Sequence, residues 1–577
     1  MAEKKKIITV LLLVMGIAAL VHFQCLFLGF NLFWDKICVF ENPFQSPISL
    51  KLISRAFTEY VEGDYRPLPL LTNSLEFTFW KYNPFGHHLT SYLFFLINTA
   101  LIFLLIEQLM KIAGCRFDTR ILVAGLTALL FGIHPLRVQL IAWVTVREHL
   151  VYASFYLLSI MAYLKWVRYQ RGKWYALAVF FALCAAFSKA MSVSLPLVLL
   201  ILDYYPLLRW NRRRWKKIIV EKIPFLIIAL LTAARSYQIV REIGIMHPTN
   251  LSVLAQNFIE FPVVFLFYIQ KTLLPIGLAP VYPIPLTSNL WLIIISWIVI
   301  FAILIFGWIK KRKYPAVLPG ILISLVLILP VGGLARATAT VLADRYAQLA
   351  NVPLIFGLAW VVIRSRQSIA FRWPAACLAA VWILFLTWRT VDYIHIWDNP
   401  IALSRQAYDR YPRDRIIEIL MLRTYNNVAL NLINEGEIDS ALEYIQQALL
   451  VNPKFLDSHL LLAYALERKG EIEPAREVRL KATEIKQKLG EEYFNRGLFH
   501  AKRAEYSKAE AMFRESLGYN EFRVEAYYNL AVIYEKRGDL HAAAAELRKA
   551  LNLQPGHLWL QNKLNSISES SEDPSLN

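Results

Sequence analysis

The chain has 577 residues, of which 57% are apolar, 14% are aromatic and 18% are charged. This composition exceeds what the cores of a soluble protein need, so we expect a polytopic membrane protein. The formal net charge of +19 would suit a nucleic-acid binder, but the basic residues form short clusters between apolar runs, as in cytoplasmic loops, which argues against that class.

Eleven apolar stretches are expected to cross the membrane. The first, 7–28, follows three lysines and is long enough to span a hydrocarbon core, which takes about 20 helical residues, so we expect a retained span with a cytoplasmic N-terminus. The others run roughly over 89–110, 121–133, 150–166, 174–188, 190–207, 223–240, 291–309, 316–333, 348–364 and 373–391.

A further apolar stretch at 257–275 is ambiguous. Counting it as a span would put the basic cluster at 310–313 on the outer side, so the positive-inside bias favours a re-entrant or interfacial segment. With eleven crossings, the C-terminal part faces outward, together with the loops at about 30–88, 134–149, 241–290 and 334–347.

The first outer loop holds candidate chemical groups. Asp35 and Glu41 follow the first span within FNLFWDKICVFENP. Asp35 lies beside aromatic residues, and partial desolvation would raise the pKa of its carboxyl group and make it a better base near neutrality. The alternative, which loop composition alone favours, is a solvated loop carboxylate or a partner of Lys36.

Charged residues also mark two later outer edges. The segment HPLRVQLIAWVTVREHL holds His134, Arg147 and Glu148 without a metal-binding spacing, and a helix-capping or packing role for His134 is equally open. Lys189 and Arg345 interrupt apolar runs, where cations are costly unless they are paired or bind an anionic ligand. A structural ion pair is the alternative for both cations. The five cysteines form no CxxC pair, so neither a disulfide framework nor a zinc site is expected.

The C-terminal part repeats with a period of 34 residues. Two sets of small residues recur at this spacing, namely Gly436, Gly470, Ala504 and Gly538, followed five positions later by Ala441, Ala475, Ala509 and Ala543. This pattern resembles the tetratricopeptide repeat, so we expect about four helical pairs over 422–566.

Single repeats cannot bury their apolar faces, so stacking creates a concave surface for an extended peptide or a partner helix. We assign the docking of an acceptor protein to the tyrosines Tyr425, Tyr493, Tyr527 and Tyr534; a structural spacer is the alternative. Pro474 lies inside the second helix of the second unit, which lacks a closing proline, and predicts a kink. The Ser-rich, acidic tail at 567–577 is expected to be disordered.

Several motifs together resemble one known family. They are WDK followed by ENP, YRPL, NPFGHHLT, HPLRVQLIAWV, REHL, SKAMSVSLPLVLLILDYYPL, ADRY and TWRTVDYIHIWD, in this order and ahead of the repeats. In these motifs the chain is similar to the transmembrane and tetratricopeptide repeat-containing O-mannosyltransferases and their bacterial relatives, which are multi-spanning glycosyltransferases of the GT-C type. We therefore expect an all-α fold with a GT-C-like transmembrane domain over 1–391 that includes the outer loop 30–88, a connecting segment over 392–421 and an α-solenoid of repeats.

The resemblance also implies a reaction. A sugar, mannose or another hexose, is carried on a polyprenyl phosphate and passed with inversion to a Ser or Thr hydroxyl of an acceptor protein on the outer face. Asp35 is then the base, while the donor phosphate is assigned to Arg66, Arg147, Lys189 and Arg345, and the shaping of the site to Glu41, His88, His134, Gln139 and Glu148. No metal-ligand cluster is visible, and no cofactor is expected beyond the lipid-linked donor. The compact loops and short repeat array favour a bacterial inner membrane over the endoplasmic reticulum.

The chain departs from the family pattern at three positions. The first loop usually carries two adjacent acidic residues, whereas here Asp35 stands alone; Gln139 replaces a usual glutamate, and His149 replaces an acidic residue. Two other hypotheses therefore stay open. One is a catalytically lapsed relative that acts as a membrane-anchored docking protein in envelope or polysaccharide assembly. The other is a transporter or flippase-like protein, against which the gathering of polar motifs in outer loops counts.

Overall fold

The computed structural model describes residues 2–30, 35, 39–40, 42–61, 63–211, 213–242, 251–283, 290–332 and 342–569. Over these ranges the secondary structure is helical and no strand forms, apart from isolated β-bridges between Val61 and Asp64 and between Tyr282 and Leu342. The chain divides between Thr424 and Tyr425 into two units. The predicted site residue Glu41 and most of the predicted disordered tail, 570–577, lie outside the described residues.

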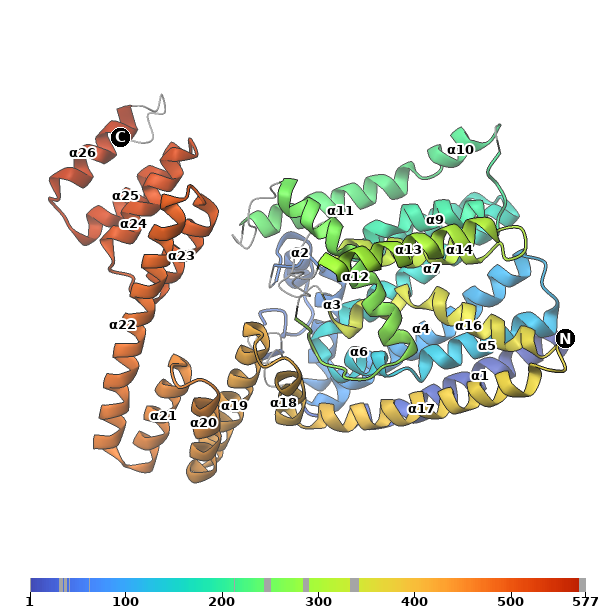
Figure 1. The fold of residues 1–577 in the computed structure, drawn as a ribbon, viewed down its shortest axis with the longest axis horizontal. Helices are drawn as coiled ribbons and strands as arrows, with labels where there is room; N and C mark the ends of the chain where they lie inside the picture. Colours follow the sequence, from blue (N-terminus) through green and yellow to red (C-terminus); the bar gives the residue numbers. More distant parts are fainter. Residues whose placement is uncertain are drawn as a thin grey trace. The chain divides into compact units, whose positions relative to one another are not determined.

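The first unit is a bundle of helices, many of which run roughly along one direction (Figure 1). Its α-helices are α1 (Ala2–His22), α2 (Leu50–Thr58), α3 (Pro67–Trp80), α4 (Pro84–Ile112), α5 (Phe117–Gly132), α6 (Val138–Ala142), α7 (Glu148–Tyr169), α8 (Gly172–Ala186), α9 (Leu195–Tyr204), α10 (Trp215–Val220), α11 (Ile223–Glu242), α12 (Leu251–Leu273), α13 (Leu290–Ile309), α14 (Val317–Gly332), α15 (Ala347–Ala350), α16 (Val352–Ser365), α17 (Arg372–Asp398) and α18 (Pro400–Arg410). Short 3-10 helices join some of them: η1 (Phe23–Phe27), η3 (Pro135–Arg137), η4 (Val144–Arg147), η5 (Ala190–Ser194) and η6 (Asp344–Tyr346).

Local sequence explains where two of these helices begin. Asn-Pro pairs precede both α4 and α18, and in each case the Asn side chain accepts a hydrogen bond from a backbone N–H of the first turn. Proline suits the first helical position because its missing N–H would lack a helical partner there anyway. The core of the unit then forms where α4 packs on α5 and α7, α7 on α8, and α1 on α5 and α17.

All eleven stretches predicted to cross the membrane are helical, but their lengths differ. Five described helical segments are long and apolar enough to cross by length and composition: Ala2–Phe27, Pro84–Ile112, Val144–Tyr169, Leu290–Ile309 and Arg372–Asp398. Two further segments qualify as bent pairs, Phe117–Gly132 with Pro135–Ala142 at 60° and Asp344–Ala350 with Val352–Ser365 at 58°. The remaining predicted spans correspond to shorter apolar helices, Gly172–Ala186, Ala190–Tyr204, Ile223–Ile239 and Val317–Gly332. At 1.5 Å per residue, Gly172–Ala186 and Ala190–Tyr204 fall short of the roughly 30 Å hydrocarbon core, whereas α11 as a whole has 20 residues and reaches it, so the number eleven stays a prediction.

The ambiguous stretch at 257–275 lies on α12. This helix is continuous from Leu251 to Leu273 and carries Pro262 in its interior. The re-entrant or interfacial placement of this stretch stays a prediction.

A buried charge network ties down the basic segment 209–222. The Asp203 carboxylate accepts hydrogen bonds from Lys222 Nζ at 2.6 Å and from Arg209 Nη1 at 2.9 Å, and Arg209 also pairs with Glu221 at 2.7 Å. Both Asp203 and Lys222 are fully buried. Arg209 and Lys222 are therefore internal structural partners, while Arg213, Arg214, Lys216 and Lys217 remain exposed.

The second unit consists of paired helices, and the start of α19 belongs to the first unit. The helices are α19 (Arg415–Glu435), α20 (Ile438–Val451), α21 (Leu456–Lys469), α22 (Ile472–Lys502), α23 (Tyr506–Tyr519), α24 (Val524–Lys536), α25 (Leu540–Leu553) and α26 (Leu558–Glu569). The 34-residue register is confirmed, because Gly436, Gly470, Ala504 and Gly538 all occupy the turn with a positive φ, between 56° and 90°. The alanines five positions later are all buried.

The predicted kink at Pro474 is wrong. Pro474 is the third residue of α22, within the first turn, where a backbone N–H has no helical partner to lose. The helix α22 runs without a break for 31 residues and joins the second repeat to the third (Figure 1).

Ala504→Gly is expected to stabilise the repeats. Ala504 has φ of 56°, where a Cβ costs about 1 kcal/mol, and glycine relieves this at the cost of more freedom in the unfolded chain, for a net gain of roughly 0.5 kcal/mol. Hydrogen exchange of the amides around 500–510 in the full-length protein measures the gain.

Gly538→Ala is the matched control at the same turn of the fourth repeat. A Cβ there meets no atom within 4 Å among the described residues, so the expected loss of about 1 kcal/mol is backbone strain alone. Slower exchange in both variants would contradict the explanation.

Candidate functional site

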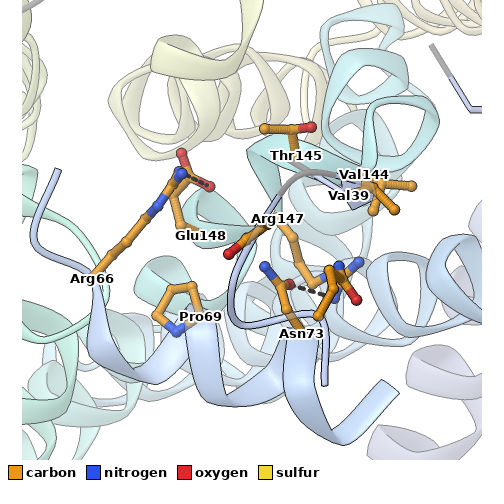
Figure 2. A pocket seen from close by; sticks show the side chains of 10 residues that line it. Val39, Arg66, Pro69, Asn73, Val144, Thr145, Arg147 and Glu148 are labelled. Carbon is orange, nitrogen blue, oxygen red and sulfur yellow. Dashed lines mark hydrogen bonds and ion pairs between the residues drawn. The ribbon is translucent and has the colours of Figure 1, made fainter. Parts of the chain in front are cut away.

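A pocket forms where the loop before α2, α3 and η4 meet. The space between atoms there is about 350 Å³, a value that includes open solvent. Figure 2 shows Arg66 facing Glu148 on one side of it and Arg147 beside Asn73 on another. The residues that line it are Val39, Asn42, Gln45, Arg66, Pro69, Asn73, Val144, Thr145, Arg147 and Glu148. Three predicted site residues, from segments up to about 80 positions apart in the chain, therefore share one pocket.

Glu148 and Lys189 lie at the centre of a network of buried charges. Arg66 Nη1 lies 3.1 Å from Glu148 Oε2, while Lys189 Nζ lies 3.1 Å from Glu148 Oε1 and 2.6 Å from Asp64 Oδ2. Two cations and two carboxylates balance each other, and they come from the outer loop, the start of α7 and the turn between α8 and η5. The ion pair that the sequence analysis left open for Lys189 is therefore present.

The network shifts the pKa values of its members outside the predicted spans. Burial raises the pKa of Asp64, but Lys189 and then Arg66 lower it by more, so the net pKa lies below its ordinary value. Burial lowers the pKa of Lys189, but Asp64 and then Glu148 raise it by more, so the ammonium group is held charged. Both shifts favour the charged pair at neutral pH.

Arg147 is engaged by protein groups on every side of its guanidinium. Nε donates to Ser91 Oγ at 3.1 Å, Nη1 donates to Asn73 Oδ1 at 3.2 Å and pairs with Glu76, and Nη2 donates to the His87 carbonyl at 3.5 Å. Since the side chain is 2% exposed, this is the environment of a structural arginine. A phosphate would have to displace these partners, so Arg66 is the better placed of the two arginines.

Asp35 is fully buried and accepts a hydrogen bond from the hydroxyl of Thr145. Thr145 in turn lines the pocket. The predicted base is thus one side chain away from the cavity that holds Arg66 and Glu148, and it is not the solvated loop carboxylate of the alternative.

Gln139 and Arg345 are joined away from the pocket. Gln139 Oε1 accepts from the backbone N–H of Arg345 at 2.8 Å, and Gln139 Nε2 donates to the Pro280 carbonyl at 2.7 Å. The amide therefore uses a donor and an acceptor at once, which a glutamate carboxylate cannot do. Gln139 holds two loops together instead of shaping the pocket, and the guanidinium of Arg345 lines a second cavity.

Two predicted site-shaping histidines are structural. His134 Nδ1 accepts from the Leu136 N–H at 3.2 Å and caps η3, while its Nε2 lies 2.9 Å from the Thr272 carbonyl. The ring nitrogens of His88 lie 3.0 Å from the Ile141 carbonyl and 3.3 Å from the Gly29 carbonyl. His134 therefore has the helix-capping role that the sequence left open. His88 links the Gly29 carbonyl, at the start of the loop after the first helix, to the Ile141 carbonyl of α6.

The predicted docking tyrosines of the repeats lie inside them. Tyr425, Tyr493 and Tyr534 are buried, and Tyr527 is half-buried against the core of the last two repeats. Tyr534 donates to Glu510 at 2.7 Å, and burial together with Glu510 raises its pKa to about 12. A buried side chain offers no docking surface, because the aromatic positions of the repeat fill the space between its own helices.

Sequence reasoning missed Asp64, Glu76 and Thr145. Asp64 stands two residues before Arg66 in GDYRPL, and Glu76 interrupts an otherwise apolar α3, a position where an unpaired carboxylate would be costly. These two places in the sequence were the signals from which Asp64 and Glu76 could have been predicted as site residues. Among the described residues, no group of three or more His, Cys, Asp or Glu side chains could hold a metal ion.

Comparisons with known proteins concern the repeats. Residues 429–487 and 524–557 match tetratricopeptide-repeat families, so the C-terminal region carries tetratricopeptide repeats. No curated protein matches the chain.

Three solved structures are similar to parts of the chain. One is the MamA RS-1 ArsTM double mutant, with 17% identity, 26% of this chain and 85% of that chain covered, and a TM-score of 0.15. Another is TTC0263, a thermophilic tetratricopeptide-repeat protein of Thermus thermophilus, with 23% identity, 32% and 95% covered, and a TM-score of 0.14. A third is the APC/C hetero-tetramer Cut9-Hcn1, with 14% identity, 78% and 81% covered, and a TM-score of 0.13. At these scores no argument about function rests on them.

Lys189→Met is expected to destabilise the protein by about 3 kcal/mol at pH 7, because it leaves the buried carboxylate of Glu148 and the partly buried carboxylate of Asp64 with one cation fewer. In the wild type the pKa of Asp64 is lowered, so its contribution to stability is present above about pH 4 and is lost as pH falls through the pKa of the folded state. The pKa of Lys189 is raised, so its contribution to stability is present below about pH 10 and is lost at higher pH. The wild-type pair is thus complete from about pH 5 to 9. In the variant the pKa of Asp64 rises, so the deficit shrinks towards pH 5.

Thermal unfolding of the purified protein in detergent between pH 5 and 8 measures this deficit. Lys6→Met is the control, since its exposed pair with Asp118 is expected to contribute less than about 1 kcal/mol. A deficit independent of pH would show that Lys189 acts through packing alone.

Gln139→Glu is expected to destabilise the protein by about 1–3 kcal/mol, because a carboxylate facing the Pro280 carbonyl has no N–H to donate. Glutamate is the usual residue at this position in the family that the chain resembles. The melting temperature, compared with that of Gln561→Glu on the exposed surface of α26, measures the effect. Equal melting temperatures would remove the bridging role from Gln139.

Proposed function

We propose that this protein transfers a sugar from a polyprenyl-phosphate donor to a Ser or Thr hydroxyl of an acceptor protein on the extracytoplasmic face of a membrane. The observation that carries the proposal is the convergence of a buried carboxylate, Asp35, on the pocket lined by Arg66 and Glu148, with Thr145 as the link. The ordered sequence motifs supply the donor class and the family, that of the O-mannosyltransferases with tetratricopeptide repeats.

The reaction requires a base and a contact for the departing phosphate. The acceptor hydroxyl oxygen attacks the sugar carbon that carries the phosphate, the new C–O bond forms as the old one breaks, and the bonding electrons leave with the phosphate oxygen. Asp35 takes the hydroxyl proton, and polyprenyl phosphate is released. Arg66 stabilises the charge on the departing phosphate, since it lines the pocket and its planar guanidinium suits phosphate oxygens.

Lys189 and Arg147 take positioning roles in this proposal. Lys189 holds Glu148 from the side opposite to Arg66, and Arg147 holds α3 to α4 through Glu76 and Ser91. When phosphate approaches, Arg66 exchanges part of its contact with Glu148, and Lys189 keeps that carboxylate neutralised.

The repeats supply the protein partner. Tetratricopeptide repeats generally bind proteins, and we assign the acceptor protein to them. The fit of the short loops and repeat array to bacterial relatives supports a bacterial inner membrane as the location.

A catalytically lapsed docking protein is the second candidate. The observation in its favour is that Arg66, Arg147 and Lys189 each pair with a carboxylate of the protein itself, so the site is charge-balanced without a ligand. In that case the membrane unit anchors a repeat scaffold.

Asp35→Asn is expected to lower transfer by about 10²–10⁴-fold, because the amide cannot take the hydroxyl proton. Purified protein is incubated with polyprenyl-phosphate sugars and candidate acceptor proteins, and transfer is followed by mass spectrometry. Asp118→Asn, at an exposed carboxylate on α5, is the matched control and is expected to retain wild-type transfer.

Thr145→Val provides a milder test, since it removes the hydrogen bond to Asp35 and keeps the side-chain shape. Unchanged transfer in Asp35→Asn would exclude Asp35 as the base. Absence of transfer by the wild type from any donor would favour the docking protein.

A further inference from the structure

Two short basic segments lie side by side at one end of the first unit. Residues 165–174 run from the last turn of α7 into the start of α8, and residues 204–220 connect α9 to α11 and include α10. The Tyr175 hydroxyl donates to the Glu221 carbonyl at 2.8 Å, so a hydrogen bond joins the two segments at their bases. Figure 1 shows α10 at this end of the bundle.

The exposed charges of the two segments are all positive. Neither segment contains an aspartate or a glutamate, and the carboxylates that flank the second one, Asp203 and Glu221, are buried. In the described ranges these carboxylates pair with Arg209 and Lys222. Seven exposed cations remain without a carboxylate partner in the described part of the chain, and we call them the basic patch: Arg168, Arg171, Lys173, Arg213, Arg214, Lys216 and Lys217.

Apolar side chains are exposed among these cations. The exposed fractions are 44% for Trp210, 43% for Trp215, 74% for Leu208 and 60% for Val220, and Lys216 Nζ lies 5.8 Å from the ring centroid of Trp215. Tryptophan is common where a membrane meets water, because its ring is amphipathic. A nucleic acid could stack on the rings but would leave the two aliphatic side chains in water, whereas the acyl region below a layer of lipid headgroups would cover them.

Buried contacts hold the second segment in place. The Asp203 carboxylate binds Arg209 within the segment and Lys222 just after its end. Between these anchors, Asn211 Oδ1 accepts the backbone N–H of Arg214 at 2.8 Å. The segment is therefore fixed before it binds anything, and little conformational freedom is lost on binding.

The position of the patch in the chain matches the depth of lipid headgroups. Four predicted spans begin or end at the two segments, namely 150–166, 174–188, 190–207 and 223–240. Each Lys or Arg held close to an anionic membrane surface strengthens the attraction by about five-fold, and salt weakens this effect. Charge, exposed apolar groups and position thus agree on one kind of partner.

We propose that the basic patch binds the phosphate headgroups of anionic phospholipids at the membrane surface. The inference goes beyond the sugar transfer proposed above and does not depend on it. Arginines hold a phosphate through two N–H groups and lysines add point charges, while Trp215, Leu208 and Val220 contact the acyl chains next to the headgroups.

The test titrates the full-length protein in a non-ionic detergent with phosphatidylglycerol or with phosphatidylcholine of the same acyl chains, and follows binding by microscale thermophoresis. The wild type is expected to bind phosphatidylglycerol about ten-fold more tightly at low salt, since one headgroup contacts one or two of the cations. Replacing four cations together, Arg213→Gln, Arg214→Gln, Lys216→Gln and Lys217→Gln, should remove most of this preference. The affinity for phosphatidylcholine should change by less than about two-fold, because its headgroup has no net charge to lose.

The matched control removes the same number of exposed charges from α22, by Arg476→Gln, Lys481→Gln, Lys486→Gln and Lys488→Gln, and should keep the preference. If the patch variant does not fold, replacing the three cations of the first segment, Arg168→Gln, Arg171→Gln and Lys173→Gln, provides the same readout.

Three results would overturn the inference. One is a wild type that binds the two lipids equally, and another is a preference that survives in both patch variants or falls equally in the α22 control. The third is a random-sequence RNA that binds the wild type more tightly than phosphatidylglycerol and loses its affinity in the patch variant, which would make the patch a nucleic-acid surface.

Discussion

The arrangement of the charges around Glu148 depends on one constraint, the cost of keeping charges away from water. Lys189 is held between Asp64 and Glu148, and Glu148 is held between Lys189 and Arg66. An isolated buried charge costs several kcal/mol, so none of these side chains is stable in place without the others. Because they belong to the outer loop, to α7 and to the turn before η5, the network fixes the loop on the bundle. The hydrogen bond from the Leu68 N–H to the Phe187 carbonyl, at 3.2 Å, reinforces the same junction.

This balance also shapes what the site can do. A charge-neutral network is stable without a ligand, yet it carries arginine and lysine groups that an anion can engage by exchanging places with a carboxylate. The pocket adjoins this network, because Arg66 and Glu148 belong to both.

The contacts give different explanations for the positions at which the chain departs from the family pattern. Gln139 replaces a glutamate at a place where both an N–H and a carbonyl are used, so the substitution fits the local hydrogen bonds and says little about lost catalysis. His149 replaces an acidic residue at the wall of the second cavity, where a second carboxylate beside Glu148 would unbalance the network. Between the second and third repeats, α22 continues without a break.

The sequence by itself determined the helical stretches, the 34-residue register and the gathering of charged residues at outer edges, because periodicity, glycine positions and apolar length are local properties. Gly436, Gly470, Ala504 and Gly538 were found this way, since a positive φ depends on the turn itself. Only the tertiary structure decided which charges pair, that Arg147 and His134 serve packing, that three predicted docking tyrosines are buried, and that Asp35 reaches the pocket through Thr145. The charge pairs around Glu148 and the hydrogen bond from Thr145 to Asp35 join residues about 40 to 125 positions apart, and His134 meets the Thr272 carbonyl 138 positions away. Such contacts are set by the packing of whole helices, which no local pattern encodes.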